Sequence, residues 1–179
     1  MKNNFWMKLL QFLAVLSFVV YFGMGLARSV IFYDIVVLNP ETNLMIERTD
    51  LSADLLFRSV FHYFAMSAYS STAYIILFLS VIMILILKRK HIKQQGWLLM
   101  ITILILLFSP FEIWNVYSDI NVSYEIFFNH INDFSSELIQ NYIKFRMNNI
   151  LSVFSGLSFL TQLTIIVLIV FKPLDKSEK

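Results

Sequence analysis

The chain alternates between long apolar runs and shorter polar stretches. Four apolar runs cover about residues 9–27, 70–88, 97–114 and 150–171. The hydrocarbon core of a bilayer is about 30 Å thick, so a helix needs about 20 mainly apolar residues to cross it. The runs lack the alternation of β-barrel strands, and backbone groups in lipid must be hydrogen-bonded within each segment. The pattern therefore predicts four transmembrane helices.

The composition excludes a soluble globular domain. Hydrophobic residues make up 58% of the 179 residues and charged residues 15%, against about 45–50% and about 25% in soluble domains. The mean hydropathy is +0.71. There is no cysteine, which excludes thiol nucleophiles, disulfides and thiolate metal sites. We therefore predict an all-α membrane protein, a four-transmembrane-helix bundle in which residues 1–179 form a single integral membrane domain.

Basic residues are distributed unequally between the two sides of this protein. Because the number of spans is even, both termini and the turn at 88–96 lie on one side. Nine of the 14 Lys and Arg residues are there: Lys2, Lys8, Lys88, Arg89, Lys90, Lys93, Lys172, Lys176 and Lys179. The positive-inside rule then places both termini in the cytoplasm and segments 28–69 and 115–149 outside. A composition rich in Ile, Lys, Asn and Phe indicates the inner membrane of a bacterial cell.

The first span has a second interpretation, as a cleaved signal peptide. Lys2 and Lys8 form a basic start, and residues 25–27 (Gly-Leu-Ala) resemble a cleavage site. The apolar stretch is longer than that of a typical signal peptide, which favours a retained helix.

The outer segments carry helix signals that predict a small, mostly helical extracytoplasmic cap. Ser52 is a suitable N-cap for a helix over 53–87, with no Gly or Pro to interrupt it. Ser135 or Ser136 could begin another helix that continues into the fourth span. Residues 31–38 and 44–46 are β-branched or apolar and flank a turn at 39–43, so they fit a short hairpin or an interfacial loop.

Histidines are the first candidates for chemistry outside the membrane. Asp54, Arg58 and His62 are four residues apart and would form one polar stripe with an Asp54–Arg58 ion pair. His130 and Asp133 would share a helix face. A single pair of this kind is too little for a metal site, which needs a third ligand at suitable spacing. We therefore predict no metal and no cofactor.

Glu112 is the acidic residue at the edge of a span, directly after a Ser-Pro-Phe sequence. An ionisable group at or near the hydrocarbon core of the membrane is a functional candidate, because a partner must offset the cost of removing it from water. Arg28, Arg58, Lys144 or Arg146 could supply that partner. The predicted structural ion pairs therefore involve Asp54, Arg58, Arg28 and Arg146.

Two classes of function fit these features. The absence of catalytic motifs favours an accessory, assembly or immunity-type subunit that binds another membrane protein or a second copy of itself. The alternative is an outer-leaflet enzyme that acts on a lipid or lipoprotein, with His62, His130 and Glu112 as catalytic acid and base residues. Spans almost free of ionisable residues argue against a monomeric transporter or proton pump. The net charge of +2 argues against nucleic acid as a partner, which leaves membrane lipids and membrane proteins.

Overall fold

The computed structural model describes residues 2–41, 45–129, 136–147 and 149–173. Its elements follow in the order α1 (Lys2–Ile35), β1 (Val36–Leu38), β2 (Met45–Glu47), α2 (Ala53–Leu87), a 3-10 turn (Arg89–His91), α3 (Gly96–Phe128), α4 (Glu137–Arg146) and α5 (Asn149–Phe171). Four of these helices, α1, α2, α3 and α5, are long and apolar enough to cross a membrane. The prediction of a helical, multi-pass membrane protein with four spans is confirmed.

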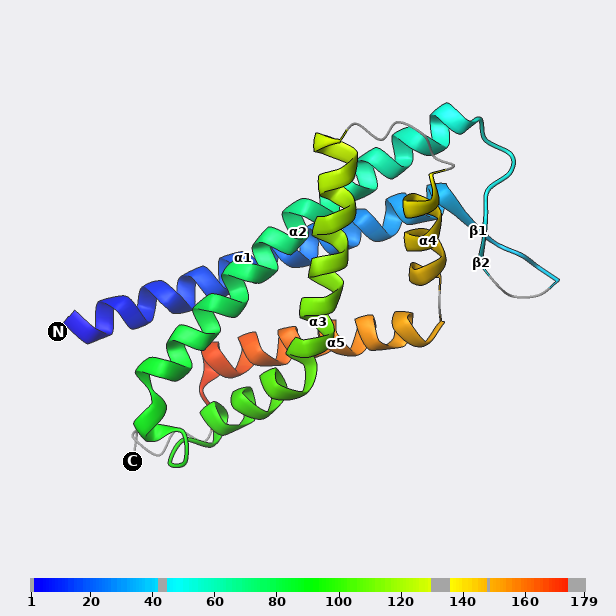
Figure 1. The fold of residues 1–179 in the computed structure, drawn as a ribbon. Coiled ribbons are helices and arrows are strands. Elements are labelled where there is room, and N and C mark those ends of the chain that lie inside the picture. The colour runs from blue at the N-terminus through cyan, green and yellow to red at the C-terminus, as the bar shows by residue number, and fades with distance from the viewer. Residues whose placement is uncertain (1, 42–44, 130–135, 148, 174–179) are drawn as a thin grey trace.

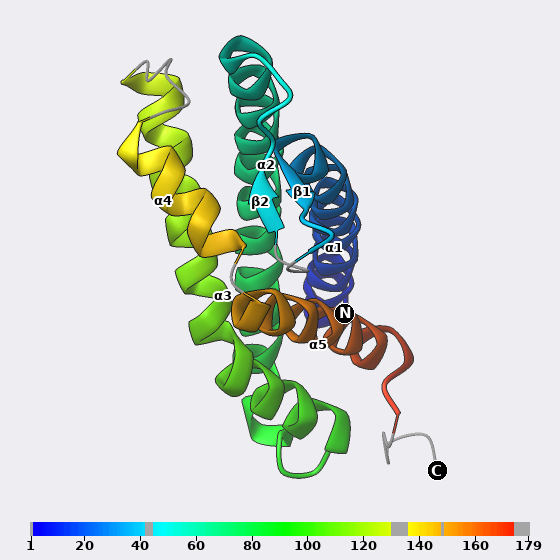
Figure 2. The same ribbon diagram turned by 90° about the vertical axis from the view of Figure 1, so that its right-hand side faces the viewer.

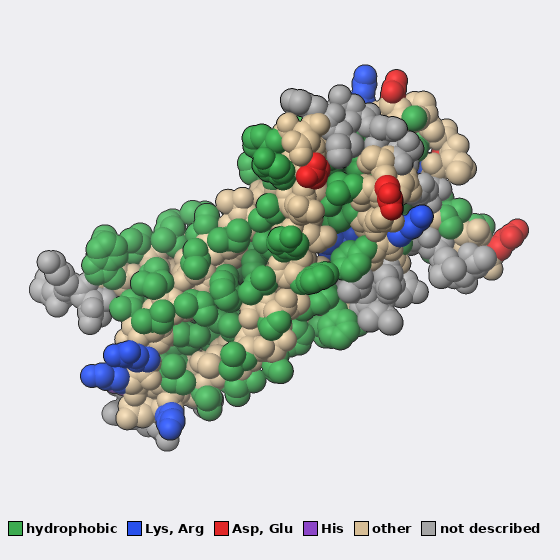
Figure 3. Space-filling model, in the orientation of Figure 1, with side chains coloured by type: hydrophobic (Ala, Val, Ile, Leu, Met, Phe, Trp, Pro, Cys, Tyr) green, Lys and Arg blue, Asp and Glu red, His purple; other side chains and the backbone are tan. Residues whose placement is uncertain are grey.

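The two ends of the molecule differ in their elements and their charge. The start of α1, the end of α5 and the turn between α2 and α3 point toward one end, named here the turn end (Figure 1). The hairpin, α4 and the adjoining ends of α1, α2 and α3 form the other, named the cap end (Figure 2). On the face in Figure 3, Lys and Arg gather at the turn end, both signs of charge appear at the cap end, and hydrophobic side chains cover the band between them.

Two of the helices are longer than the apolar pattern predicts. The first and third spans were expected to end at 27 and 114, but α1 continues to Ile35 and α3 to Phe128. The helices continue past the apolar runs because polar residues beyond those runs, such as Arg28 and Asp119, are paired with each other between α1 and α3. The third helix also continues through Pro110. It is bent in its middle (Figure 1), as expected where proline removes a backbone hydrogen bond.

The predicted start of a helix at Ser135 or Ser136 is confirmed, since Ser136 is the N-cap of α4. Its predicted continuation into the fourth span is wrong, because two helices take the place of one. The shorter α4 ends at Arg146, with Met147 as its C-cap, and α5 begins at Asn149. The two run in different directions (Figure 1). The physical reason is packing: Ile139 and Ile143 are fully buried against the cap ends of α2 and α3. These contacts fix α4 across the bundle rather than in line with α5.

Of the two alternatives for residues 31–46, the structure shows the hairpin. Val36 pairs with Glu47 and Leu38 with Met45 in antiparallel register. The predicted first strand was too long, since residues up to Ile35 belong to α1. The backbone carbonyl of Ile35 accepts a hydrogen bond from the Arg48 amide at 3.0 Å, and Val36 is buried. The hairpin is therefore held directly on the end of α1.

Two apolar clusters hold the molecule together at different levels. One joins α1, α2, α3 and α5 and includes Leu77, Trp97 and Ile165. The other lies at the cap end, where Val60, Phe64, Val122 and Ile139 pack with the end of α1 and the start of the hairpin. Polar side chains occupy the level between the two clusters, and the candidate site lies there.

Candidate functional site

A buried carboxylate on α3 joins three helices. Asp119 is only 3% exposed. Its Oδ2 accepts a hydrogen bond from Arg28 of α1 at 2.5 Å, and its Oδ1 accepts one from Arg146 of α4 at 2.5 Å. The Tyr142 hydroxyl, also on α4, donates to the same Oδ1. These four residues are called the arginine–aspartate cluster below.

Aromatic rings surround the two guanidinium groups. The Arg28 guanidinium lies 5.7 Å from the centre of the Tyr63 ring, and that of Arg146 lies 5.3 Å from the centre of the Tyr142 ring. Such contacts stabilise a cation that has lost part of its water shell. Arg28 also donates to the Ser67 hydroxyl at 3.3 Å, and Arg146 donates through Nε to the Tyr142 hydroxyl at 2.8 Å. Both cations are therefore held in place from several sides.

The protonation states on α4 follow from burial and neighbouring charge. Burial raises the pKa of the Tyr142 phenol well above its usual value. Burial alone would lower the pKa of Arg146. The contacts of the guanidinium with Tyr142 and Asp119 have a larger, opposite effect, so the pKa of Arg146 lies well above its usual value. Tyr142 is thus a neutral hydrogen-bond donor and Arg146 a permanent cation. With one carboxylate between two guanidinium groups, the cluster carries a net charge of +1.

Glu112 lies two helical turns from Asp119, about 10 Å along α3 toward the turn end. It is 6% exposed. Its carboxylate accepts hydrogen bonds from the Tyr21 hydroxyl at 2.6 Å and the Ser158 hydroxyl at 2.8 Å. The prediction of a basic partner for Glu112 is wrong: among the described residues its partners are neutral donors. The arginines expected to serve it are instead paired with Asp119.

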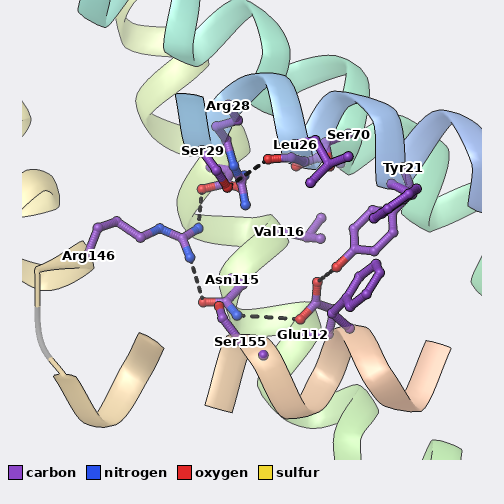
Figure 4. A pocket seen from close by; sticks show the side chains of 16 residues that line it. Tyr21, Leu26, Arg28, Ser29, Ser70, Glu112, Asn115, Val116, Arg146 and Ser155 are labelled. Carbon is purple, nitrogen blue, oxygen red and sulfur yellow. Dashed lines mark hydrogen bonds and ion pairs between the residues drawn. The ribbon is translucent and has the colours of Figure 1, made fainter. Parts of the chain in front are cut away.

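Asn115 connects the two acidic positions. Its amide nitrogen lies 3.5 Å from Glu112 Oε2, and its amide oxygen accepts from Arg146 Nη1 at 3.4 Å. Figure 4 shows Arg28 and Arg146 converging at one end of this network, Tyr21 and Glu112 at the other, and Asn115 between them. The network therefore includes side chains from every long helix and from α4.

A cavity of about 340 Å³ lies beside this network. Its lining comes from five helices: Tyr21, Phe22, Gly25, Leu26, Arg28, Ser29, Ser70, Ser71, Glu112, Asn115, Val116, Asp119, Arg146, Ser155, Gly156 and Phe159. Leu26, 54% exposed, and the exposed Phe22 form an apolar edge on α1. The hydroxyl of Ser71 is buried and has no hydrogen-bond partner among the described residues. The polar cavity, as it is called below, thus combines a charged interior with an apolar edge.

The predicted catalytic histidines lie elsewhere. His62 is exposed and rests edge-on against the ring of Phe61, outside the cavity lining. His130 and Asp133 fall outside the described residues. Of the three predicted catalytic residues, only Glu112 lines the cavity. Among the described residues, no three His, Asp or Glu side chains are grouped so that they could hold a metal ion.

The predicted ion-pair residues divide into two groups. Arg28 and Arg146 are both ion-paired, and both share Asp119. Asp54 and Arg58 are exposed, and the ion pairs found within the described part of the chain do not include them. Water solvates both exposed charges, so an ion pair between Asp54 and Arg58 would add little to the stability of the protein.

Asp119 and Asn115 are the functional candidates that the sequence pattern did not reveal. Residues from 115 onward were assigned to an outer connection, so their helical spacing was not considered. Glu112, Asn115 and Asp119 are three, four and seven residues apart, which places them on one face of a helix. A polar stripe with this spacing on an otherwise apolar helix was the available signal.

Comparisons of the chain with protein-family models, with curated proteins and with solved structures found no match. The fold and the site define a class nonetheless: a four-span membrane protein with a polar, charged cavity among its helices. Its function is therefore inferred from this geometry.

The shared carboxylate makes a prediction about stability. Asp119→Asn leaves two partly buried guanidinium groups without their buried counter-ion, and breaking a buried pair costs about 3–5 kcal/mol. We expect the detergent-solubilised variant to lose that much free energy of unfolding in a denaturant titration. Glu41→Gln, an exposed carboxylate in the connection after β1, is the control and should change stability by less than about 0.5 kcal/mol. Equal stability of Asp119→Asn and wild type would contradict the assigned role of Asp119.

Proposed function

We propose that this protein binds an amphiphile of the outer leaflet, with the ligand's polar head in the polar cavity. The observation that carries the proposal is the cavity itself, since charged side chains line its interior and apolar side chains its edge. Ligand sites are commonly concave, with a few polar groups that orient the ligand.

The proposal includes an orientation, with both termini and the turn end in the cytoplasm. Excess Lys and Arg at that end support it, following the positive-inside rule. The same orientation gives the depth of the cavity. Glu112 lies about 24 Å and Asp119 about 34 Å along α3 from Gly96, at 1.5 Å per residue. Because α3 is bent between Gly96 and these residues (Figure 1), their depth is less than this path length, so a hydrocarbon core about 30 Å thick would end near Asp119. The cavity would then lie in the outer part of the membrane.

The edge of the cavity suits a ligand that also has an apolar chain. Phe22 and Leu26 of α1 and Gly156 of α5 line the cavity and are exposed on the flank of the bundle. In the proposed orientation this flank faces lipid. An amphiphile could place its head among the polar groups while its chain stays along the flank, so that neither part leaves its preferred surroundings.

A second candidate function is that of a subunit that binds another membrane protein. Tyr117, Ile120, Tyr124 and Phe128 are exposed on the cap-end half of α3, and their spacing places them on one helix face. The rings of Tyr124 and Phe128 stack with centroids 5.0 Å apart. Large exposed apolar patches are typical of interaction surfaces. In the proposed orientation this surface, named the α3 aromatic row, would extend beyond the membrane.

The orientation can be tested because the chain contains no cysteine. Single-cysteine variants Glu41→Cys and Gln94→Cys place a thiol at the exposed connection after β1 and at the exposed turn after α2. We expect a membrane-impermeant maleimide to label Glu41→Cys in intact cells and Gln94→Cys only after permeabilisation. Labelling of both in intact cells, or the reverse pattern, would overturn the orientation.

Amphiphile binding can be tested with glycine substitutions. A Cβ atom at Gly156 or at Gly25 would meet no neighbouring atom within 4 Å, so Gly156→Leu should fold normally and fill part of the cavity. Gly23→Leu, equally unobstructed on α1 and outside the lining, is the matched control. We expect native mass spectrometry in a mild non-ionic detergent to find one bound amphiphile on wild type and on Gly23→Leu, and at least about tenfold less on Gly156→Leu. Equal retention by all three, or none by wild type, would contradict the proposal.

The subunit function has its own test. Tyr124→Ser and Phe128→Ser should each remove most of a stoichiometric protein partner from the purified complex. Tyr69→Ser, an exposed tyrosine on α2, should keep that partner. A partner retained by all three variants would place the contact away from the α3 aromatic row.

A further inference from the structure

The charge within the polar cavity is divided between its two ends. Arg28 and Arg146 share the single carboxylate of Asp119 at one end, which leaves that end with one uncompensated positive charge. Glu112 lies at the other end and brings a carboxyl group bound by neutral donors. A cavity of this kind distinguishes the two ends of a ligand.

We propose that the arginine end of the polar cavity binds the phosphate group of an anionic amphiphile, an inference that rests on the proposed function. Arginine guanidinium groups suit phosphate because their planar N–H donors can form paired hydrogen bonds with two oxygens. The phosphate would approach the side of Arg28 and Arg146 that lines the cavity. One monoanionic phosphate would neutralise the net positive charge of the cluster.

The arginines retain donor capacity for such a ligand. Each guanidinium has five N–H donors. Arg28 uses Nη1 for both Asp119 and Ser67, and its Nε and Nη2 have no hydrogen-bond partner within the described part of the chain. Arg146 uses Nε and Nη2 for Tyr142 and Asp119, and its contact with Asn115 at 3.4 Å is long. These hydrogen bonds fix both side chains without exhausting their donors.

The rest of the lining favours binding of the anion at this end only. Glu112 would repel a phosphate at the opposite end, and its oxygens already accept from Tyr21, Ser158 and Asn115. The buried Ser71 hydroxyl lacks a partner among the described residues and lines the same cavity. A buried hydroxyl without a hydrogen-bond partner destabilises the protein, and a hydrogen bond to an oxygen of the bound ligand would remove that cost. Ser71 therefore offers a further hydrogen bond to the head of the ligand.

The phosphate could reach the cavity on a lipid or as a free ion, and the apolar edge formed by Phe22 and Leu26 favours the lipid. The test uses wild-type protein stripped of lipid in an uncharged detergent. It is titrated separately with phosphatidic acid, with diacylglycerol of the same chains and with inorganic phosphate, and binding is followed by native mass spectrometry and by thermal stabilisation. We expect phosphatidic acid to bind at least about tenfold more tightly than diacylglycerol or inorganic phosphate. One additional hydrogen bond between the ligand and a charged group accounts for a difference of this size.

Substitution of one arginine locates the site. Arg28→Gln leaves a neutral Arg146–Asp119 pair, and we expect the preference for phosphatidic acid over diacylglycerol to fall about tenfold. Arg58→Gln, which removes an exposed arginine from α2, is the control and should bind both lipids as wild type does. The comparison of the two lipids on wild type remains valid even if Arg28→Gln does not fold.

The outcomes separate this inference from the proposed function. Equal affinity of wild type for phosphatidic acid and diacylglycerol would overturn phosphate recognition and leave amphiphile binding intact. Binding of neither lipid would overturn both. Inorganic phosphate that binds as tightly as phosphatidic acid would overturn the amphiphile as the carrier of the phosphate.

Discussion

The burial of one carboxylate at the boundary between two apolar clusters is the constraint on which the rest of the structure depends. Asp119 is removed from water on α3, and a buried charge is tolerated only when it is paired and hydrogen-bonded. Its two partners are Arg28, on the part of α1 that enters the cap end, and Arg146 of α4, a helix that is not one of the four spans. The pairing therefore fixes three helices relative to one another. It also explains why α1 and α3 continue as helices past the ends of their apolar runs.

The two acidic residues on this face of α3, Glu112 and Asp119, are both buried, but different kinds of partner stabilise their carboxyl groups. Asp119 is surrounded by cations and aromatic rings, whereas Glu112 is held by hydroxyl and amide donors from α1, α3 and α5. Both arrangements satisfy the oxygens, but the first leaves excess positive charge at its end, whereas the second brings no cation to Glu112. The separation of about 10 Å along the helix gives the polar cavity a positive end and an acidic end. This polarity, more than any single residue, distinguishes the cavity from a packing defect.

The sequence predicted the spans well because their signal is local. Long apolar runs locate α1, α2, α3 and α5, and Ser52 with the uninterrupted sequence after it located all of α2. The cap and the site depend on contacts that no local pattern contains. Arg28 and Asp119 are 91 positions apart, and the break between α4 and α5 is marked by neither Gly nor Pro. That break is determined by Ile139 and Arg146, whose partners lie on other helices. Glu112 was identified as a candidate because burial of an acid near a span is itself a local signal.

The volume of the cavity is maintained by the choice of small residues around it. Gly25, Ser29, Ser71, Ser155 and Gly156 line the space, and a Cβ atom at either glycine would meet nothing within 4 Å. Glycine in a helix interior costs about 1 kcal/mol relative to alanine, and an unfilled volume loses the dispersion contacts that larger side chains would make. A sequence selected only for stability would fill this space with the leucine and isoleucine that it uses elsewhere. The small residues therefore support a ligand, rather than a protein side chain, as the group that completes the packing between α1 and α5.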